Sequence, residues 1–285
     1  MEKKLILRGT LAGTIGGVVA FVFARIFAEP QIQKAIDYES GRDAAQEVLD
    51  RAAGIAIEAA HADPFSRAVQ GNVGIGVGMI LFGAALGTLF AVAYCVCLGR
   101  VGNLRPRTLA MLVALGGFLG LYLVPFLKYP ANPPAIGHEE TISQRTFLYL
   151  VMVICSVVFL VGAVILGKRL AVRYGNWNAT LLAIGAFVVA IGVVMLLLPS
   201  LGELAANERE FGKQATETPL PLTDANGNIV YPGFPADVLF LFRFYSVGAQ
   251  LLLWSTIGLV FAPMADRLLR PAMAPTVQRE PVSVA

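Results

Sequence analysis

Two short segments of the chain combine imidazole and carboxylate side chains, which are donors for divalent transition metals. His138-Glu139-Glu140 are consecutive, and Glu58 and His61 are three residues apart, which places them on one face if that segment is helical. Imidazole together with carboxylate oxygen suits Co²⁺, Ni²⁺ or Zn²⁺. The chain has 2 histidines, and both lie in these segments. The alternative is that each histidine is an ordinary surface residue.

Further carboxylates surround these segments. Glu39, Asp43 and Glu47 recur every fourth residue, so a helix there would carry a stripe of like charge that must be neutralised. Arg42, Arg51 or a divalent cation would supply that neutralisation, and a simply solvated face is the alternative. The expected metal ligands are therefore the two His-containing segments, with Glu29 and Glu39 as lesser candidates: Glu58, His61, His138, Glu139, Glu140, Glu29 and Glu39.

Enzyme signatures are absent from the sequence. There is no Ser/His/Asp or HExxH arrangement. The segment Gly162–Arg169 resembles a P-loop but lacks its Ser or Thr and lies within an apolar run. Asp224-Ala-Asn-Gly-Asn228 begins like a calcium loop without the required later glutamate, so we expect a turn in a β-hairpin-like excursion. No catalysis and no resident cofactor are expected.

Six long apolar segments must position the candidate ligands. They lie near residues 5–28, 73–98, 109–127, 146–167, 179–198 and 238–264. Each reaches the roughly 20 residues that a helix needs to cross a hydrocarbon core of about 30 Å. Backbone groups in lipid must be paired within their own segment, which favours helices. We expect an all-α, six-helix polytopic membrane protein with a single domain over residues 1–270 and a disordered cytoplasmic tail over 271–285.

The charges between these segments are sorted. Lys and Arg gather at the N-terminus, between the second and third segments, between the fourth and fifth, and after the sixth. The remaining connections carry both histidines and every carboxylate except Glu2, Asp266 and Glu280. The positive-inside rule then places the basic set and both termini in the cytoplasm. The net charge of +3 is split between two compartments and is not a nucleic-acid footprint.

Two of the outward connections have internal structure. Residues 31–61 contain no proline and are expected to form a helix on the membrane surface. In residues 123–137, Pro125 is expected to interrupt the third helix near its outer end, and Pro130, Pro133 and Pro134 should hold an extended strap that leads to His138. The strap would fix where His138-Glu139-Glu140 lie.

Glycines are concentrated in the second and third apolar segments. Gly83 and Gly87, like Gly116 and Gly120, form small-xxx-small patterns. Such patterns let helix backbones approach closely. A permeation path lined by exposed backbone, as in transporters, is the second interpretation.

Several stretches resemble the probable cobalt transporter subunit family (CbtA), over nearly the whole chain. They are Leu7–Gly13, Phe21–Arg25, Glu29–Glu39, the proline-rich Val124–Pro134 and Gly175–Thr180. The resemblance implies bacterial cobalt uptake linked to cobalamin synthesis, in the inner membrane, with a small His-rich one-helix protein as the partner. In another branch of the family a His follows the first helix, where this chain has Arg25 and Glu29-Pro30.

These observations predict a membrane protein that captures a divalent metal, Co²⁺ above all, on acidic outer loops and passes it through a Gly-rich helix bundle. The acidic loops would concentrate the cation electrostatically. The alternative is a non-transporting membrane assembly subunit whose acidic loops bind a partner protein.

Overall fold

The computed structural model describes residues 1–55, 66–214 and 216–273, and almost all of its regular structure is helical. The helices are α1 (Glu2–Phe27), α2 (Glu29–Ala52), α3 (Arg67–Val69), α4 (Ile75–Cys97), α5 (Pro106–Gly117), α6 (Val124–Lys128), α7 (Ile142–Leu197), α8 (Ala205–Phe211) and α9 (Ala236–Met273). Two π-helical turns, η1 (Gln70–Gly74) and η2 (Phe118–Leu123), continue into α4 and α6, and two 3₁₀ turns are η3 (Glu139–Thr141) and η4 (Leu201–Glu203). The strands β1 (Leu222–Thr223) and β2 (Ile229–Tyr231) form an antiparallel hairpin.

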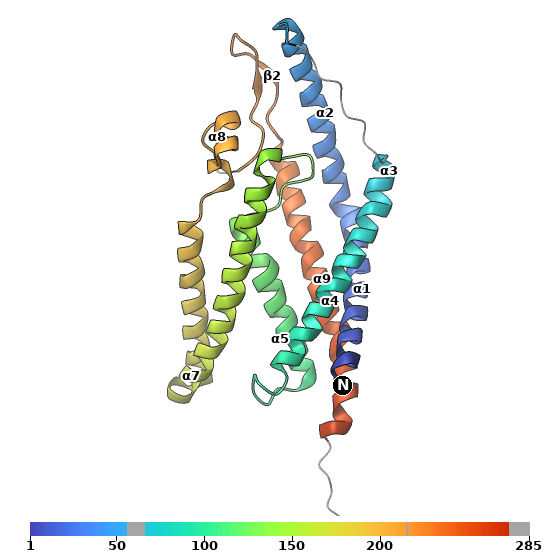
Figure 1. Ribbon diagram of the computed structural model, residues 1–285, viewed down its shortest axis with the longest axis vertical. Helices are drawn as coiled ribbons and strands as arrows, with labels where there is room; N and C mark the ends of the chain where they lie inside the picture. Colours follow the sequence, from blue (N-terminus) through green and yellow to red (C-terminus); the bar gives the residue numbers. More distant parts are fainter. Residues whose placement is uncertain (56–65, 215, 274–285) are drawn as a thin grey trace, which may run out of the picture.

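Within the described residues, 5 helices are long and apolar enough to cross a membrane. The sequence predicts six segments, and the difference lies in α7, which contains both the fourth and the fifth. Its backbone leaves helical geometry at Gly175, with φ 74° and ψ 163°. The two arms of α7 run side by side in opposite directions from this bend (Figure 1). A single glycine in the left-handed region is therefore enough to reverse the chain without a separate loop.

The basic segments gather at one end of the bundle. The N-terminus, the connection between α4 and α5, the bend of α7 and the last turns of α9 all lie at the lower end of Figure 1. Lys168, just before the bend, donates a hydrogen bond to the carbonyl of Arg100 in the neighbouring connection. The sorting of charges seen in the sequence thus corresponds to two ends of one molecule.

Small residues bring α1 and α4 into backbone contact. A Cβ at Gly87 would lie 2.6 Å from Cα of Gly13, and one at Gly83 would lie 2.8 Å from Cα of Gly17. Neither glycine leaves room for a methyl group. The Gly-rich pattern over these positions is therefore a packing interface, which is the first of the two interpretations that the sequence allows.

The apolar interior has two main parts. One unites α1, α4, α5 and α9 and has Phe90, Tyr94 and Phe261 near its centre, where Phe261 meets each of the other two rings edge to face. The other unites the two arms of α7 with α6 through Leu148, Met152 and Ile191. The turn η2 packs against α5, α7 and α9, so it joins the two parts.

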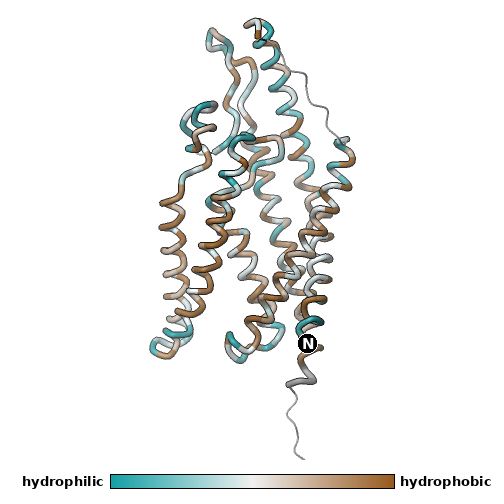
Figure 2. The backbone as a smooth tube through the Cα atoms, in the orientation of Figure 1, coloured by the Kyte–Doolittle hydropathy of each residue, from teal (hydrophilic) through white to brown (hydrophobic). Residues whose placement is uncertain are grey.

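Beyond the apolar bundle the chain forms a polar head, which consists of residues 29–52, 129–141, 201–214 and 216–235 (Figures 1 and 2). Helix α2 follows α1 with only the helical Ala28 between them, and it extends away from the bundle along the long axis of the molecule. The sequence predicts a helix over residues 31–61 lying on the membrane surface. The observed helix covers Glu29–Ala52 and projects outward. Residues 56–61 of the predicted helix lie outside the described residues.

A small apolar cluster holds the projecting helix in place. Ala35 and Tyr38 of α2 pack on Ile136 of the strap, on Tyr231 of β2 and on Phe234 after it. The Tyr38 hydroxyl donates to the Pro232 carbonyl at 2.9 Å, and burial raises the pKa of Tyr38 although Arg42 opposes the shift. Because three separate segments share this cluster, the head is a folded unit.

The hairpin turn agrees with its sequence prediction. The Asp224 carboxylate accepts hydrogen bonds from the Asn226 and Asn228 backbone amides at 2.9 and 2.8 Å, and Gly227 has a φ of +84°. Hydrogen bonds from Asn228 lower the pKa of Asp224, and the bond from the Asn228 side chain has a larger effect than the bond from its backbone amide. At the C-terminus, α9 continues through Met273, so residues 271–273 of the predicted tail are helical. Residues 274–285 of that tail lie outside the described residues.

Candidate functional site

A fully buried carboxylate, that of Glu217, organises the centre of the polar head. One of its oxygens accepts hydrogen bonds from the Thr141 hydroxyl and from the Asn207 side-chain amide, the latter at 2.9 Å. The other oxygen lies 2.7 Å from a guanidinium nitrogen of Arg145, near the start of α7. Glu217 is 0 % exposed, so its charge depends on these partners instead of water.

The same network holds the proline strap, residues 129–138. The Asn132 side-chain amide donates to the Glu217 backbone carbonyl at 3.4 Å, and Arg243 of α9 donates to the Asn132 side-chain oxygen at 2.8 Å. Gly137 has a φ of +139°, and a Cβ there would lie 2.7 Å from a nitrogen of Arg145. The strap is therefore pinned at both ends, and its prolines are only part of what fixes it.

His138, Glu139 and Glu140 stand at the end of the strap. The Thr141 hydroxyl, whose one hydrogen is shared with Glu217, lies 2.7 Å from the His138 carbonyl, and the Glu140 amide donates to Nδ1 of His138 at 3.3 Å. Both glutamates are exposed, and Glu140 lies 3.8 Å from Arg209 of α8. A metal at Nδ1 would displace the Glu140 amide, whereas the two carboxylates are accessible from outside.

Glu29 occupies a different place, at the junction of α1 and α2. It is only 9 % exposed and pairs with Arg67 of α3. A Cβ at Gly71 would lie 2.6 Å from the Glu29 carboxylate, so this glycine makes room for the pair. Nearby, Arg25 donates to the Asn72 side-chain oxygen at 2.9 Å. The Glu29 carboxylate already has a cationic partner, which a metal would have to replace.

The carboxylate stripe lies on α2 as predicted. Glu47 pairs with Arg51 at 3.0 Å, one turn away, which is one of the two neutralising partners suggested by the sequence. Arg42 instead donates to the Leu220 carbonyl at 3.2 Å. Glu39 is half-buried and follows Tyr38 of the apolar cluster.

Among the residues that the structure describes, no three His, Cys, Asp or Glu side chains come together as a metal site. Glu29 and Glu39 lie ten residues apart on α2, and the His138–Glu140 segment lies at η3, a different element. Glu58 and His61 lie outside the described residues. The seven-residue ligand set therefore stays a prediction.

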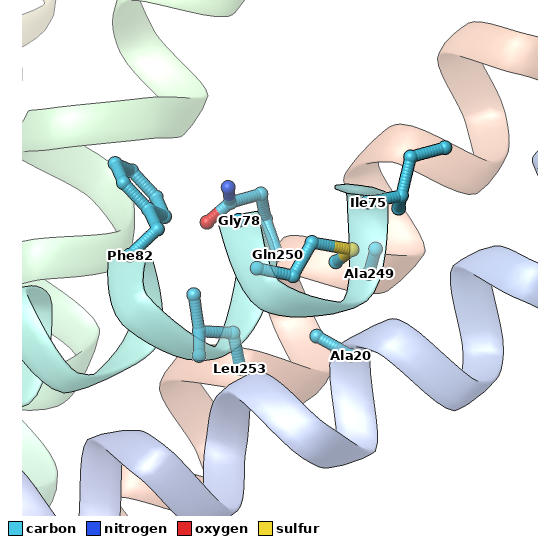
Figure 3. Close-up of a pocket in the computed structure, with 8 residues that line it drawn as sticks. Ala20, Ile75, Gly78, Phe82, Ala249, Gln250 and Leu253 are labelled. Atoms are coloured by element: carbon cyan, nitrogen blue, oxygen red, sulfur yellow. The ribbon is translucent and has the colours of Figure 1, made fainter. Parts of the chain in front are cut away.

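A cavity of about 380 Å³ lies within the apolar bundle, between α1, α4 and α9. Its walls include Ala20, Gly78, Phe82 and Leu253, and Gln250 is the polar side chain among them. Figure 3 shows the Gln250 amide extending toward the residues of α4. A Cβ at Gly78 would have no neighbour within 4 Å, in contrast to Gly83 and Gly87 one and two turns further along.

The model of the family described as probable cobalt transporter subunit (CbtA) matches residues 2–266, which is most of the chain. The chain belongs to the CbtA family. No curated protein and no solved structure matches it. With its long apolar helices, it is a multi-pass membrane protein and a probable cobalt transporter subunit.

Membership in the CbtA family confirms the resemblance that the sequence shows. Two polar residues that matter in the structure, Glu217 and Gln250, were not identified from the sequence. Glu217 is one of many acids in the third outer connection, and nothing local distinguishes it, because its partners are 10 to 76 residues away. Gln250 does carry a signal, since a polar side chain inside an apolar segment is rare and tends to be functional. Because the Gln250 side chain is an uncharged amide, a search of the apolar segments for Asp, Glu and His does not find it.

Proposed function

We propose that the protein is a six-crossing subunit of a cobalt importer whose termini lie in the cytoplasm and whose polar head faces outward. The gathering of the basic segments at one end supports this orientation through the positive-inside rule. The two arms of α7 would be the fourth and fifth crossings. A bacterial inner membrane is the location that this orientation and the family imply.

The observation that carries the proposal is the rigidly held position of Glu139 and Glu140. Two exposed carboxylates and a histidine stand at the end of a strap that is tied to the buried Glu217 network. A divalent cation collected there would be held by a rigid support, and this lowers the ordering cost of binding. Glu58 and His61 would complete the mixed N/O ligand set that suits Co²⁺.

Glu29 and Glu39 are secondary in this proposal. The Arg67 partner makes Glu29 a poor first contact for a cation. Glu39 belongs to the acidic face of α2, which would raise the local cation concentration electrostatically.

The route across the membrane is proposed to begin along the outer part of α4. Gly78 has open space beside it and borders the cavity that contains Gln250. Beyond it, Gly83 and Gly87 are closed by contact with α1. A route along the Gly-rich helix would therefore have to leave α4 near the cavity.

The family description names a subunit, which implies a partner. We assign this role to a small one-helix membrane protein with a His-rich segment, as the family resemblance implies, and we place the pair in cobalt supply for cobalamin synthesis. Growth of a deletion strain in low cobalt should then be restored either by the gene or by added cobalamin.

Cobalt binding to the purified full-length protein tests the site. Calorimetric affinity for Co²⁺ should fall at least about tenfold in the triple variant His138→Ala/Glu139→Gln/Glu140→Gln, since even outer-shell ligand changes cost 10- to 100-fold. Glu208→Gln in α8 is the control, because Glu208 is an exposed carboxylate of the same head and pairs only weakly with Lys213, at 3.7 Å. Equal affinities of the triple variant and the control would refute the site. Failure of the unaltered protein to bind cobalt would favour the non-transporting assembly role.

A further inference from the structure

A recess of about 320 Å³ lies where the proline strap meets the first turns of α7, and neither the cobalt proposal nor the Gln250 cavity uses it. Its polar wall contains Tyr129, Asn132, Arg145 and Tyr149. Its apolar edge contains Ile142 and Leu150. A recess with these two sides suits an amphipathic ligand.

Arg145 supplies hydrogen-bond donors to this recess. One of its terminal nitrogens pairs with Glu217, and the side chain is 27 % exposed. A guanidinium has five N–H donors in one plane. The single contact with Glu217 leaves donors of this plane for a second acceptor. Arg145 is therefore able to hold Glu217 and an anion together.

Two further cations lie near the recess. Arg243 donates to the side-chain oxygen of Asn132, and Lys128 lies 5.8 Å from the centre of the Tyr129 ring. Carboxylates are also near: Glu217 pairs with Arg145, Glu203 is engaged with the Ser200 amide at 2.7 Å, and the exposed Glu139 and Glu140 precede Ile142. An anionic ligand is therefore favoured by the guanidinium of Arg145 in the wall of the recess and not by a count of charges.

The apolar edge continues down the bundle. Ile142, Leu150 and Ile154 are 54 %, 52 % and 62 % exposed, and with Thr146 they recur every fourth residue. They therefore form one strip on the outer face of α7. In a membrane this strip faces fatty acyl chains. The recess shares Ile142, Thr146 and Leu150 with this strip, so it lies at the end of the strip nearest the start of α7.

We propose that this recess binds the phosphate-bearing headgroup of an anionic phospholipid from the outer leaflet, with an acyl chain along the Ile142–Ile154 strip. Arginine matches phosphate through paired N–H donors, and tyrosines are typical of the bilayer boundary. The bound phosphate would share Arg145 with Glu217. Lipid binding would thus stiffen the support of the strap, and it would do so whether or not the protein carries cobalt.

The test is thermal unfolding of the purified protein in detergent with added dioleoyl-phosphatidylglycerol, dioleoyl-phosphatidylcholine or inorganic phosphate. Phosphatidylglycerol at about ten times its Kd should raise Tm by about 2–4 °C, and phosphatidylcholine should give a much smaller rise. Native mass spectrometry should show one phosphatidylglycerol retained per chain.

Two variants locate the effect. Thr146→Trp places an indole in the recess while leaving both members of the Arg145–Glu217 pair in the chain, and it should remove the shift. Arg145→Lys keeps the charge beside Glu217 but loses the planar donor set, so it should reduce the shift. Arg209→Gln is the matched control, because Arg209 is an exposed arginine of the same head at 76 % exposure, and its shift should equal that of the unaltered protein.

Three results would overturn the proposal. Equal shifts with both lipids would exclude headgroup recognition. An unchanged shift in Thr146→Trp would place the lipid elsewhere. A full shift with inorganic phosphate alone would identify a free anion as the ligand in place of a lipid.

Discussion

Replacing the buried carboxylate of Glu217 by an amide should loosen the polar head without disturbing the apolar bundle. Glu217→Gln keeps the shape of the side chain and removes its charge. Thr141 and Asn207 then donate to a neutral oxygen, and the new amide nitrogen faces the Arg145 guanidinium. Arg145 is left without its ionic partner.

The size of the effect follows from these contacts. A hydrogen bond to a charged group contributes about 1.5–3 kcal/mol and a neutral one about 0.5–1.5 kcal/mol, so each converted contact loses about 1 kcal/mol. Three contacts are affected, and the 27 % exposure of Arg145 lets water offset part of its loss. We expect a cost of about 2–3 kcal/mol, somewhat below the 3–5 kcal/mol typical of a fully buried broken pair.

Hydrogen–deuterium exchange followed by mass spectrometry measures this locally. A loss of about 2–3 kcal/mol corresponds to roughly 30- to 150-fold faster exchange in peptides covering residues 135–141 and 205–211. Peptides from α1 and α4 should be unaffected, because no residue of these helices belongs to the network. Glu208→Gln, which weakens only an exposed pair, should change exchange by less than about 0.5 kcal/mol.

A double variant separates charge from packing. In Glu217→Gln/Arg145→Met no buried charge is left unpaired, so the double variant should exchange more slowly than Glu217→Gln alone. The reasoning is refuted if Glu217→Gln behaves like Glu208→Gln. It is also refuted if the effects of the two substitutions simply add.

Two further perturbations follow from the backbone contacts. Gly87→Val should lower the free energy of unfolding by about 1–3 kcal/mol, as is typical of overpacking, because its Cβ would lie 2.6 Å from Cα of Gly13. The melting temperature in detergent should fall accordingly. Gly78→Ala, whose Cβ meets nothing within 4 Å, is the control, and equal losses in both variants would contradict the packing account. In the hairpin turn, hydrogen bonds from Asn228 lower the pKa of Asp224. The stability that the charged carboxylate adds is therefore present above the ordinary aspartate pKa of about 3.9, and it is lost as pH falls through the lower pKa of Asp224 in the folded protein. The Asn228 amide-proton shift should therefore titrate with a midpoint below about 3.9, and Asp224→Ala should abolish the titration.

Local patterns predicted much of this fold. The apolar runs and the sorted charges give the positions of the long helices and the end at which the connections meet. The spacing of Gly83 and Gly87 predicted a close helix contact, which the structure places between α4 and α1. The Asp224–Asn228 segment predicted the hairpin turn. These features depend on residues within a few turns of one another, so they leave a periodic signal in the chain.

Features that depend on distant partners were missed. The sequence predicts that residues 31–61 form a helix on the membrane surface, whereas α2 extends away from the bundle, where Tyr38 contacts Pro232 and Phe234. Likewise Glu217 differs from its acidic neighbours only through Arg145 and Thr141. The metal ligands have the same difficulty, because any site would combine connections that are far apart in sequence.

Three arginines at the head end of the bundle have partners in the polar head. Arg67, at the start of the α3–α4 helix, pairs with Glu29, and Arg145, at the start of α7, pairs with Glu217. Arg243, near the start of α9, donates to the Ala131 carbonyl and to Asn132. Each of the three joins one end of a long apolar helix to a different segment of the head.

Such pairs add little net stability, because desolvation offsets most of their attraction, yet leaving one partner alone is costly. These pairs therefore fix how the head is aligned on the bundle. If the head were shifted by one helical turn, an arginine or a carboxylate would be buried without a partner. The exposed carboxylates Glu139 and Glu140 gain a fixed position from this arrangement although neither takes part in a buried pair. The bundle and the acidic surface are thus coupled through two buried carboxylates, Glu29 and Glu217. If Glu139 and Glu140 capture the cation as proposed, substitutions of these two buried residues should weaken capture indirectly, by moving the segment that carries Glu139 and Glu140.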